Sequence, residues 1–201
     1  MTFYKIYVII LLENKRKAFC NEKSRKGEKK LTKVFWVDGS SSGNPGPGGF
    51  GVVELYWDSQ LLNKMILNYC YQELFDDTTN NRMELAAILH VARLAKEDPD
   101  NEYIIFSDSM YSVQTINSWM RDWASKNWVT SRNRPVENQD LIKPIYELFN
   151  RPFFNCQVLK CRGHNNILGN EIADAVASNN RSKFDRLIDK NHIMVLDNPF
   201  Y

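Results

Sequence analysis

The sequence has few cysteines, and their spacing does not match a metal site. Four occur among 201 residues, and none of them forms the C-x2-C spacing that is typical of zinc sites. Cys156 and Cys161 flank a segment that we predict to be a strand, which favours buried free thiols in a reducing compartment. We therefore expect a cytoplasmic protein.

The sequence also lacks an apolar run that is long enough to cross a membrane. The apolar stretch at residues 6–12 is much shorter than the roughly 20 residues that span a bilayer. It could be the apolar part of a signal peptide, but the residues after it offer no small-residue cleavage site. Other interpretations are an additional strand, an arm that binds a partner, or a start codon placed too early. We expect no contact with a membrane.

Charge of one sign is not in large excess over the whole chain, because the net charge is +2. Its distribution is uneven: residues 1–33 contain ten Lys and Arg against three Glu, a local charge of +7 that leaves −5 elsewhere. Contents of 43% hydrophobic and 25% charged residues are ordinary for a globular protein. We expect a basic extension or linker at residues 1–32, one domain at 33–180, and a weakly patterned C-terminal tail at 181–201.

Hydrophobic periodicity predicts an α/β fold. Strand-like and amphipathic segments follow one another in a clear order along the chain. The predicted strands are 34–38, 50–57, 61–70, 103–107 and 154–160, and the predicted helices are 81–97, 109–120, 138–149 and 169–179. Three antiparallel strands followed by alternating helices and strands make a mixed five-stranded sheet that is flanked by helices.

Four acidic residues in separate segments are candidates for one site. Asp38 and Asp108 each end an apolar strand-like run, so their side chains meet at one edge if these strands are parallel neighbours. Glu84 and Asp174 border the apolar stripes of two predicted helices. Such acids repel one another unless divalent cations neutralise them, so we predict a site for two Mg²⁺ ions, with Mn²⁺ as an alternative. Taken singly, each Asp is more typical of a turn or cap, and Glu84 could simply favour the helix dipole.

The order and spacing of these residues resemble type 1 ribonuclease H over about residues 33–180. The resemblance rests on Asp38-Gly39-Ser40, Gly43 through Gly49, Thr79 through Glu84, Ser107-Asp108-Ser109, Trp119 through Leu141, Gly163-His164, Asn170-Glu171 and Asp174. It implies a ribonuclease H-like sheet and a catalytic domain at 33–180. It also implies hydrolysis of the RNA strand of an RNA–DNA hybrid, which leaves a 3′-hydroxyl and a 5′-phosphate.

The resemblance further implies roles for particular residues. The metal ligands and catalytic carboxylates would be Asp38, Glu84, Asp108 and Asp174. His164 would assist proton transfer and product release, although a loop histidine is more often simply solvated. Contacts with the RNA strand, including its 2′-hydroxyls, would come from Asn44, Asn80, Asn81 and Ser109. Turn chemistry alone could also explain Asn44.

A segment in which cations alternate with aromatic residues is expected to bind the phosphate backbone. Its candidate contacts are Trp119, Trp123, Lys126, Trp128, Arg132 and Arg134. In the family, this segment matches the basic protrusion that holds the DNA strand. The match is less lysine-rich here, and Met110 stands where a polar amide often contacts the substrate. Trp119 and Trp123, one helical turn apart, are more typical of packing than of base stacking.

Two rival interpretations remain beside a monomeric ribonuclease H that binds hybrids. A hybrid-binding module with an inactive site is one, but such a module has no reason to keep clustered acids. A relative with the same fold is the other: a resolvase, an integrase or the nuclease domain of a reverse transcriptase. No fingers or palm region precedes the domain in this sequence, and the basic segment favours the stand-alone enzyme.

Deleting residues 1–32 should reduce the salt dependence of hybrid binding, because the cations of the arm would no longer displace counterions from the phosphates. Fluorescence anisotropy with a labelled hybrid, at several salt concentrations, measures the slope of log affinity against log salt. An unchanged slope would show that the arm does not contact the nucleic acid.

Overall fold

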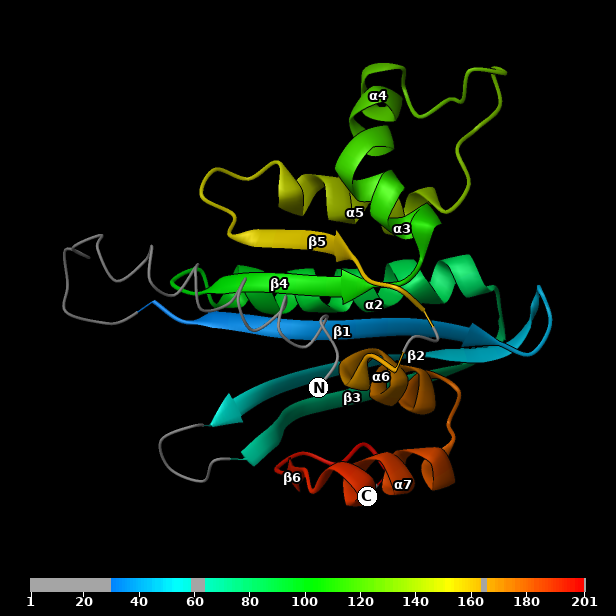
Figure 1. The fold of residues 1–201 in the computed structure, drawn as a ribbon. Helices are drawn as coiled ribbons and strands as arrows, with labels where there is room; N and C mark the ends of the chain where they lie inside the picture. The colour runs from blue at the N-terminus through cyan, green and yellow to red at the C-terminus, as the bar shows by residue number, and fades with distance from the viewer. Residues whose placement is uncertain (1–29, 59–63, 164–165, 201) are drawn as a thin grey trace. The chain divides into compact units, whose positions relative to one another are not determined.

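A mixed six-stranded sheet runs through the part of the chain that the structure describes. The computed structural model describes residues 30–58, 64–163 and 166–200, and Leu31–Tyr201 is one structural unit. Within that unit the strand order is β5-β4-β1-β2-β3-β6, and helices cover both faces of the sheet (Figure 1). This arrangement confirms the predicted α/β class.

The first three strands are antiparallel neighbours, and the next two run parallel to the first. The six strands are β1 (Thr32–Ser41), β2 (Gly46–Asp58), β3 (Lys64–Thr78), β4 (Glu102–Ser107), β5 (Cys156–Lys160) and β6 (Met194–Val195). The predicted count of five strands was wrong by one. The additional strand, β6, pairs with β3 over two residues, which is too short a stretch to show an alternating pattern in the sequence.

The helices correspond to the predicted ones with two differences. They are α2 (Asn80–Glu97), α3 (Met110–Gln114), the π-helical turn η1 (Thr115–Trp119), α4 (Met120–Ser125), α5 (Gln139–Phe149), α6 (Leu168–Ala177) and α7 (Arg181–Asn191). The helix predicted at 109–120 is therefore a run of three segments that continues to Ser125, and helix α7 was not predicted. No helix in the described ranges is long and apolar enough to cross a bilayer.

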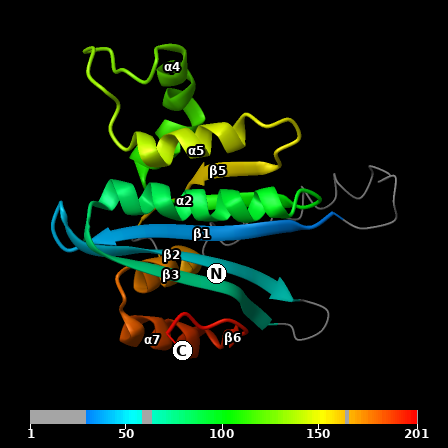
Figure 2. The same cartoon turned by 180° about the vertical axis from the view of Figure 1, so that it is seen from behind.

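The core lies between the sheet and its helices. Helices α2 and α5 cover one face of the sheet, and α6 covers the other, as the views from both sides show (Figure 2). The apolar stripe that predicted α2 is buried, with Leu85, Ile88 and Ala92 fully enclosed against the sheet. Burial of a side chain such as Leu85 or Ile88 stabilises the fold by about 1.5–3 kcal/mol, so this stripe fixes which side of α2 faces the strands.

Strand pairing places two of the predicted acids side by side. Strands β1 and β4 are parallel, with Val37 opposite Ser107 in the register. The next residues along each strand are Asp38 and Asp108, which therefore emerge at the same edge of the sheet. The predicted site required these two strands to be parallel neighbours, and the structure confirms this.

A polar network closes the opposite end of the sheet. The carboxylate of Asp98, just after α2, accepts hydrogen bonds from Lys33 Nζ (2.8 Å) on β1, from Asn101 Nδ2 (2.9 and 3.0 Å) and from the Tyr103 hydroxyl (2.9 Å) on β4. The hydrogen bonds from Lys33 and Asn101 lower the pKa of Asp98 from 3.8 to about 2. The network ties two strands to the end of a helix.

Replacing Asp98 by Asn should destabilise the protein by about 1 kcal/mol at pH 7. Because the pKa of Asp98 is lower in the folded state, its contribution is present above pH 4 and is lost as the pH falls towards about 2. Urea unfolding of both proteins between pH 7 and pH 2.5 measures the difference, which should shrink with falling pH. Asp100→Asn, in the neighbouring turn, is the control. A difference that is independent of pH would contradict the assignment.

Candidate active site

A polar pocket opens at the edge where β1 and β4 end. Its lining comes from four separate parts of the chain, namely β1, the start of α2, the residue after β4, and α6. The lining residues are Asp38, Gly39, Ser40, Asn80, Glu84, Asp108, Asn170, Glu171 and Asp174. All four predicted carboxylates therefore line one pocket.

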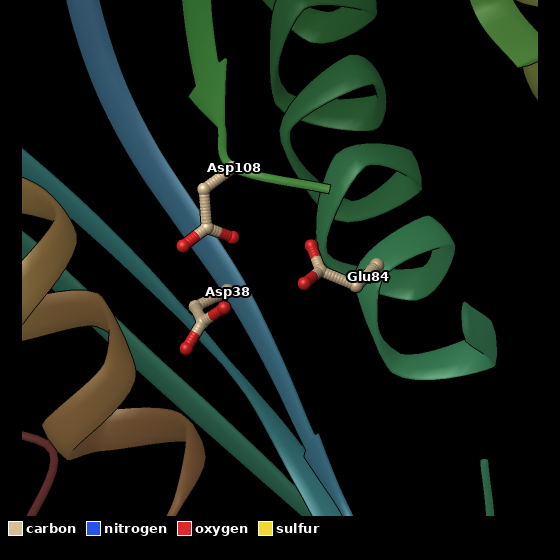
Figure 3. A group of neighbouring side chains, drawn as sticks. All are labelled: Asp38, Glu84 and Asp108. Atoms are coloured by element: carbon tan, nitrogen blue, oxygen red, sulfur yellow. The ribbon is translucent and has the colours of Figure 1, made fainter. Parts of the chain in front are cut away.

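Three of these carboxylates form a tight cluster. One oxygen from each of Asp38, Glu84 and Asp108 lies within 4.8 Å of the others, and the three side chains point toward one another (Figure 3). Asp38 is 7% exposed and Glu84 is 5% exposed, whereas Asp108 is half-buried. The cluster is thus open to the pocket mainly on the side of Asp108.

Glycine allows the helix and the strand to come this close. A Cβ atom at Gly39 would collide with the backbone of Met83 and Glu84 at the start of α2. The missing side chain therefore lets α2 place Glu84 against Asp38. Gly163 has a similar role on the other side, because a Cβ atom there would collide with the carboxylate of Asp108.

Burial and mutual repulsion dominate the electrostatics of the cluster. Burial and the nearby charge of Asp108 raise the pKa of Glu84 to about 8, although hydrogen bonds with Asp38 and Ser107 oppose the shift. Burial, and then the charges of Glu84, Asp108 and Asp174, raise the pKa of Asp38 well above its ordinary value. Without a cation, such a cluster therefore retains protons that isolated carboxylates would lose.

Neutral donors hold two of the three carboxylates in place. Ser107 Oγ donates to Glu84 Oε2 (3.3 Å), and Asn170 Nδ2 donates to Asp108 Oδ2 (3.0 Å). The ammonium of Lys160 donates to the backbone carbonyl of Asp108 instead of its carboxylate. An all-oxygen set of clustered carboxylates is what hard divalent cations such as Mg²⁺ and Mn²⁺ prefer, so these residues fit a metal site.

The fourth carboxylate has a different environment. Asp174, in α6, lines the same pocket and adds to the repulsion on Asp38. It also forms an ion pair with Lys183 Nζ, which lies 3.2 Å from Glu171 Oε2 as well. Asp174 therefore already has a positive partner from α7.

The predicted substrate contacts lie in several places around the pocket. Asn80 lines it and accepts a hydrogen bond from Ser41 Oγ (3.1 Å). Asn44 and Asn81 are exposed. Ser109 caps α3, because its hydroxyl accepts from the backbone N–H of Ser112 (3.2 Å). His164 falls outside the described residues, as do residues 1–29 of the predicted basic extension.

The aromatic residues of the basic segment are packed, and its cations are exposed. Trp119 and Trp123 lie 5.7 Å apart between ring centroids. Trp123 and Trp128 pack against the hydrophobic core, where Trp128 also contacts Tyr146 edge-on. The predicted contacts Lys126, Arg132 and Arg134 are exposed, as is Arg121. Substrate contacts by this segment stay a prediction.

Three residues of the pocket region had no predicted role. Asn170 and Glu171 lie one helical turn before Asp174, and that spacing on a predicted helix could have identified them. Lys183 had no such signal, because it lies in the segment whose structure was not assigned. Its contact depends on how α7 folds back beside α6.

Known proteins share this sequence and this fold. The family model RNase H matches residues 30–182. The ribonuclease H of Rickettsia felis is 39% identical over 148 residues, which cover 74% of this chain and 90% of the relative. That of Prosthecochloris aestuarii is 37% identical over 145 residues, which cover 72% of this chain and 91% of the relative.

Solved structures agree with these relatives. The crystal structure of LC9-RNase H1, a type 1 RNase H with the type 2 active-site motif, is 25% identical with a TM-score of 0.62, covering 76% of this chain and 72% of that one. The solution structure of the PFV RNase H domain is 21% identical, and the match covers 74% of this chain and 93% of that one. Its TM-score of 0.61 shows that the two share the fold. The chain therefore belongs to the ribonuclease H family and is an enzyme, a hydrolase of nucleic acid.

Proposed function

We propose that this protein is an endonuclease that hydrolyses the RNA strand of RNA–DNA hybrids and depends on divalent metal ions. The carboxylate cluster within 4.8 Å carries this proposal, because it fits hard cations and belongs to a chain of the ribonuclease H family. The proposed catalytic domain is residues 33–180, with a basic extension before it. The relatives at 37–39% identity are named ribonuclease H, which supports the same substrate.

The proposed metal ligands are Asp38, Glu84, Asp108 and Asp174. When bound, two Mg²⁺ or Mn²⁺ ions supply positive charge that stabilises the attacking and leaving oxygens of a phosphodiester. Asp38 and Glu84 hold their oxygens toward the pocket because they are buried and fixed by β1 and α2. Asn170 orients Asp108 through the hydrogen bond to its Oδ2.

The proposed reaction is attack of water on phosphorus at the RNA strand. The attacking water loses a proton as its oxygen bonds to phosphorus, the bond from phosphorus to the 3′ oxygen breaks, and that oxygen takes up a proton. The products are a 3′-hydroxyl and a 5′-phosphate. His164, as a loop histidine near neutral pKa, is the proposed group for proton transfer and product release.

Polar and basic groups near the pocket are proposed to hold the hybrid. Asn80 lines the pocket, and Asn81 is exposed beside it at the start of α2, which suits contact with 2′-hydroxyls. Arg82 holds this end of α2 against α5 through two hydrogen bonds to Asp140 (2.5 and 3.0 Å). A monomeric state and a cytoplasmic location stay predictions.

A hybrid-binding protein without activity is the second candidate. The same clustered carboxylates speak against it, because buried acids that repel one another destabilise a fold that has no use for cations. Cleavage that requires a divalent cation separates the two functions.

Replacing Asp38 by Asn should reduce hybrid cleavage at least about 100-fold, because it removes a ligand charge but little volume. A gel assay with an RNA-labelled hybrid, with Mg²⁺ or with EDTA, measures this; duplex DNA and duplex RNA should remain uncut. In EDTA the variant should melt at the same temperature as the wild type or higher, because one repelling charge is gone. Asp100→Asn is the control. Near-full activity of the Asp38 variant would show that the ligand assignment is wrong.

Replacing Arg132 and Arg134 by Gln should weaken hybrid binding and lower the salt slope by about one for each phosphate contact that is lost. Because both side chains are exposed, the fold should not change, and circular dichroism checks this. Arg151→Gln, in the turn between α5 and β5, removes one positive charge elsewhere and is the control. Equal effects of the control and the double variant would argue against a phosphate-binding role for this segment.

A further inference from the structure

Helix α7 places an ammonium group against the pocket. Three residues separate this helix from the end of α6, and the Asn180 side chain caps it by accepting from the backbone N–H of Lys183 (2.9 Å). Lys183 Nζ forms ion pairs with Asp174 and, at 3.2 Å, with Glu171 Oε2. Both carboxylates line the pocket. Lys183 therefore connects α7 to the acidic side chains of the pocket.

The ion pair is partly shielded from solvent. The side chain of Lys183 is 24% exposed, that of Glu171 is 21% exposed and that of Asp174 is 31% exposed. Water and salt therefore screen these charges less than they screen a pair on the open surface. The positive charge of Lys183 acts directly on the oxygens of Asp174.

Packing fixes the helix that carries this lysine. Phe184, the next residue, is 1% exposed and contacts the ring of Phe200 edge-on, with centroids 5.2 Å apart. The position of Lys183 is thus set by the hydrophobic core and by the Asn180 cap as well as by its ion pairs. Removing the ammonium group leaves both of these other restraints in place.

The two sides of the pocket are consequently unequal. Asp38, Glu84 and Asp108 face one another, and two of them, Glu84 and Asp108, receive hydrogen bonds from the neutral side chains of Ser107 and Asn170. Asp174, by contrast, already has a cation on its Oδ2 atom. A divalent ion that binds Asp174 must compete with that ammonium, whereas an ion in the three-carboxylate cluster does not.

We propose that Lys183 is a built-in competitor of the second divalent ion, so that this ion binds Asp174 only when it displaces the lysine ammonium. This inference rests on the metal-dependent function proposed above. In this proposal, Lys183 lowers the affinity of the protein for the second ion and leaves its affinity for the first ion unchanged. The first ion binds the cluster of Asp38, Glu84 and Asp108, and the second binds more weakly.

The test is metal binding by Lys183→Met, measured by titration calorimetry with Mn²⁺ alone. Loss of the competing charge should tighten the weaker of two binding events by about tenfold and leave the stronger one within about twofold. Lys190→Met is the matched control, because it removes the same charge from an exposed position of the same helix. Lys183→Arg keeps the charge and should restore the weak second event.

Each outcome has a distinct meaning. If the wild type binds no Mn²⁺ at all, the proposed metal-dependent function is wrong. If the wild type binds Mn²⁺ but Lys183→Met shows an unchanged or weaker second event, or the same change as Lys190→Met, the competition is refuted. Thermal melting in EDTA checks folding, and Lys183→Gln replaces the Met variant in the same titration if that variant does not fold.

Discussion

The site depends on like charges that the fold holds together against their repulsion. Burial alone would favour the neutral form of Asp38 and Glu84, and Asp108 adds to this preference. The free energy that keeps the three side chains within 4.8 Å comes from the surrounding structure: parallel pairing of β1 with β4, and the buried stripe of α2. Hydrophobic packing thus supplies the energy that a carboxylate cluster lacks on its own.

Glycine and neutral hydrogen-bond donors complete this arrangement. Gly39 permits the close approach of α2, and Ser107 and Asn170 orient carboxylates without neutralising them. An ammonium group in their place would compensate the charge and remove the attraction for a divalent ion. The side chains that orient Glu84 and Asp108 therefore leave room for a cation to supply the compensating charge.

The Asp174 side of the pocket is built differently, because α7 brings Lys183 to it. The ion pair places a positive charge beside one of the carboxylates that line the pocket. Under the proposal made above, the same contact competes with an incoming ion. One pocket thus holds a cluster of three carboxylates together with a fourth carboxylate that has a lysine partner.

Residue patterns in the sequence predicted much of the fold and of the candidate site. Leu85 and Ile88 at helical spacing defined α2, and apolar runs that end in Asp38 and Asp108 marked two strand ends, because local periodicity reflects which face is buried. The two-residue strand β6 and the break of the predicted 109–120 helix at η1 left no such periodicity. They arise from contacts between segments.

The amino-acid sequence by itself determined the fold class, the family and the identity of the four carboxylates, because spacing and composition record local structure and chemistry directly. Tertiary structure alone decided which of these acids cluster and which one has a cationic partner. Lys183 reaches Asp174 through the turn that follows α6 and through the burial of Phe184. Such contacts depend on the relative placement of two helices, which no short sequence pattern specifies.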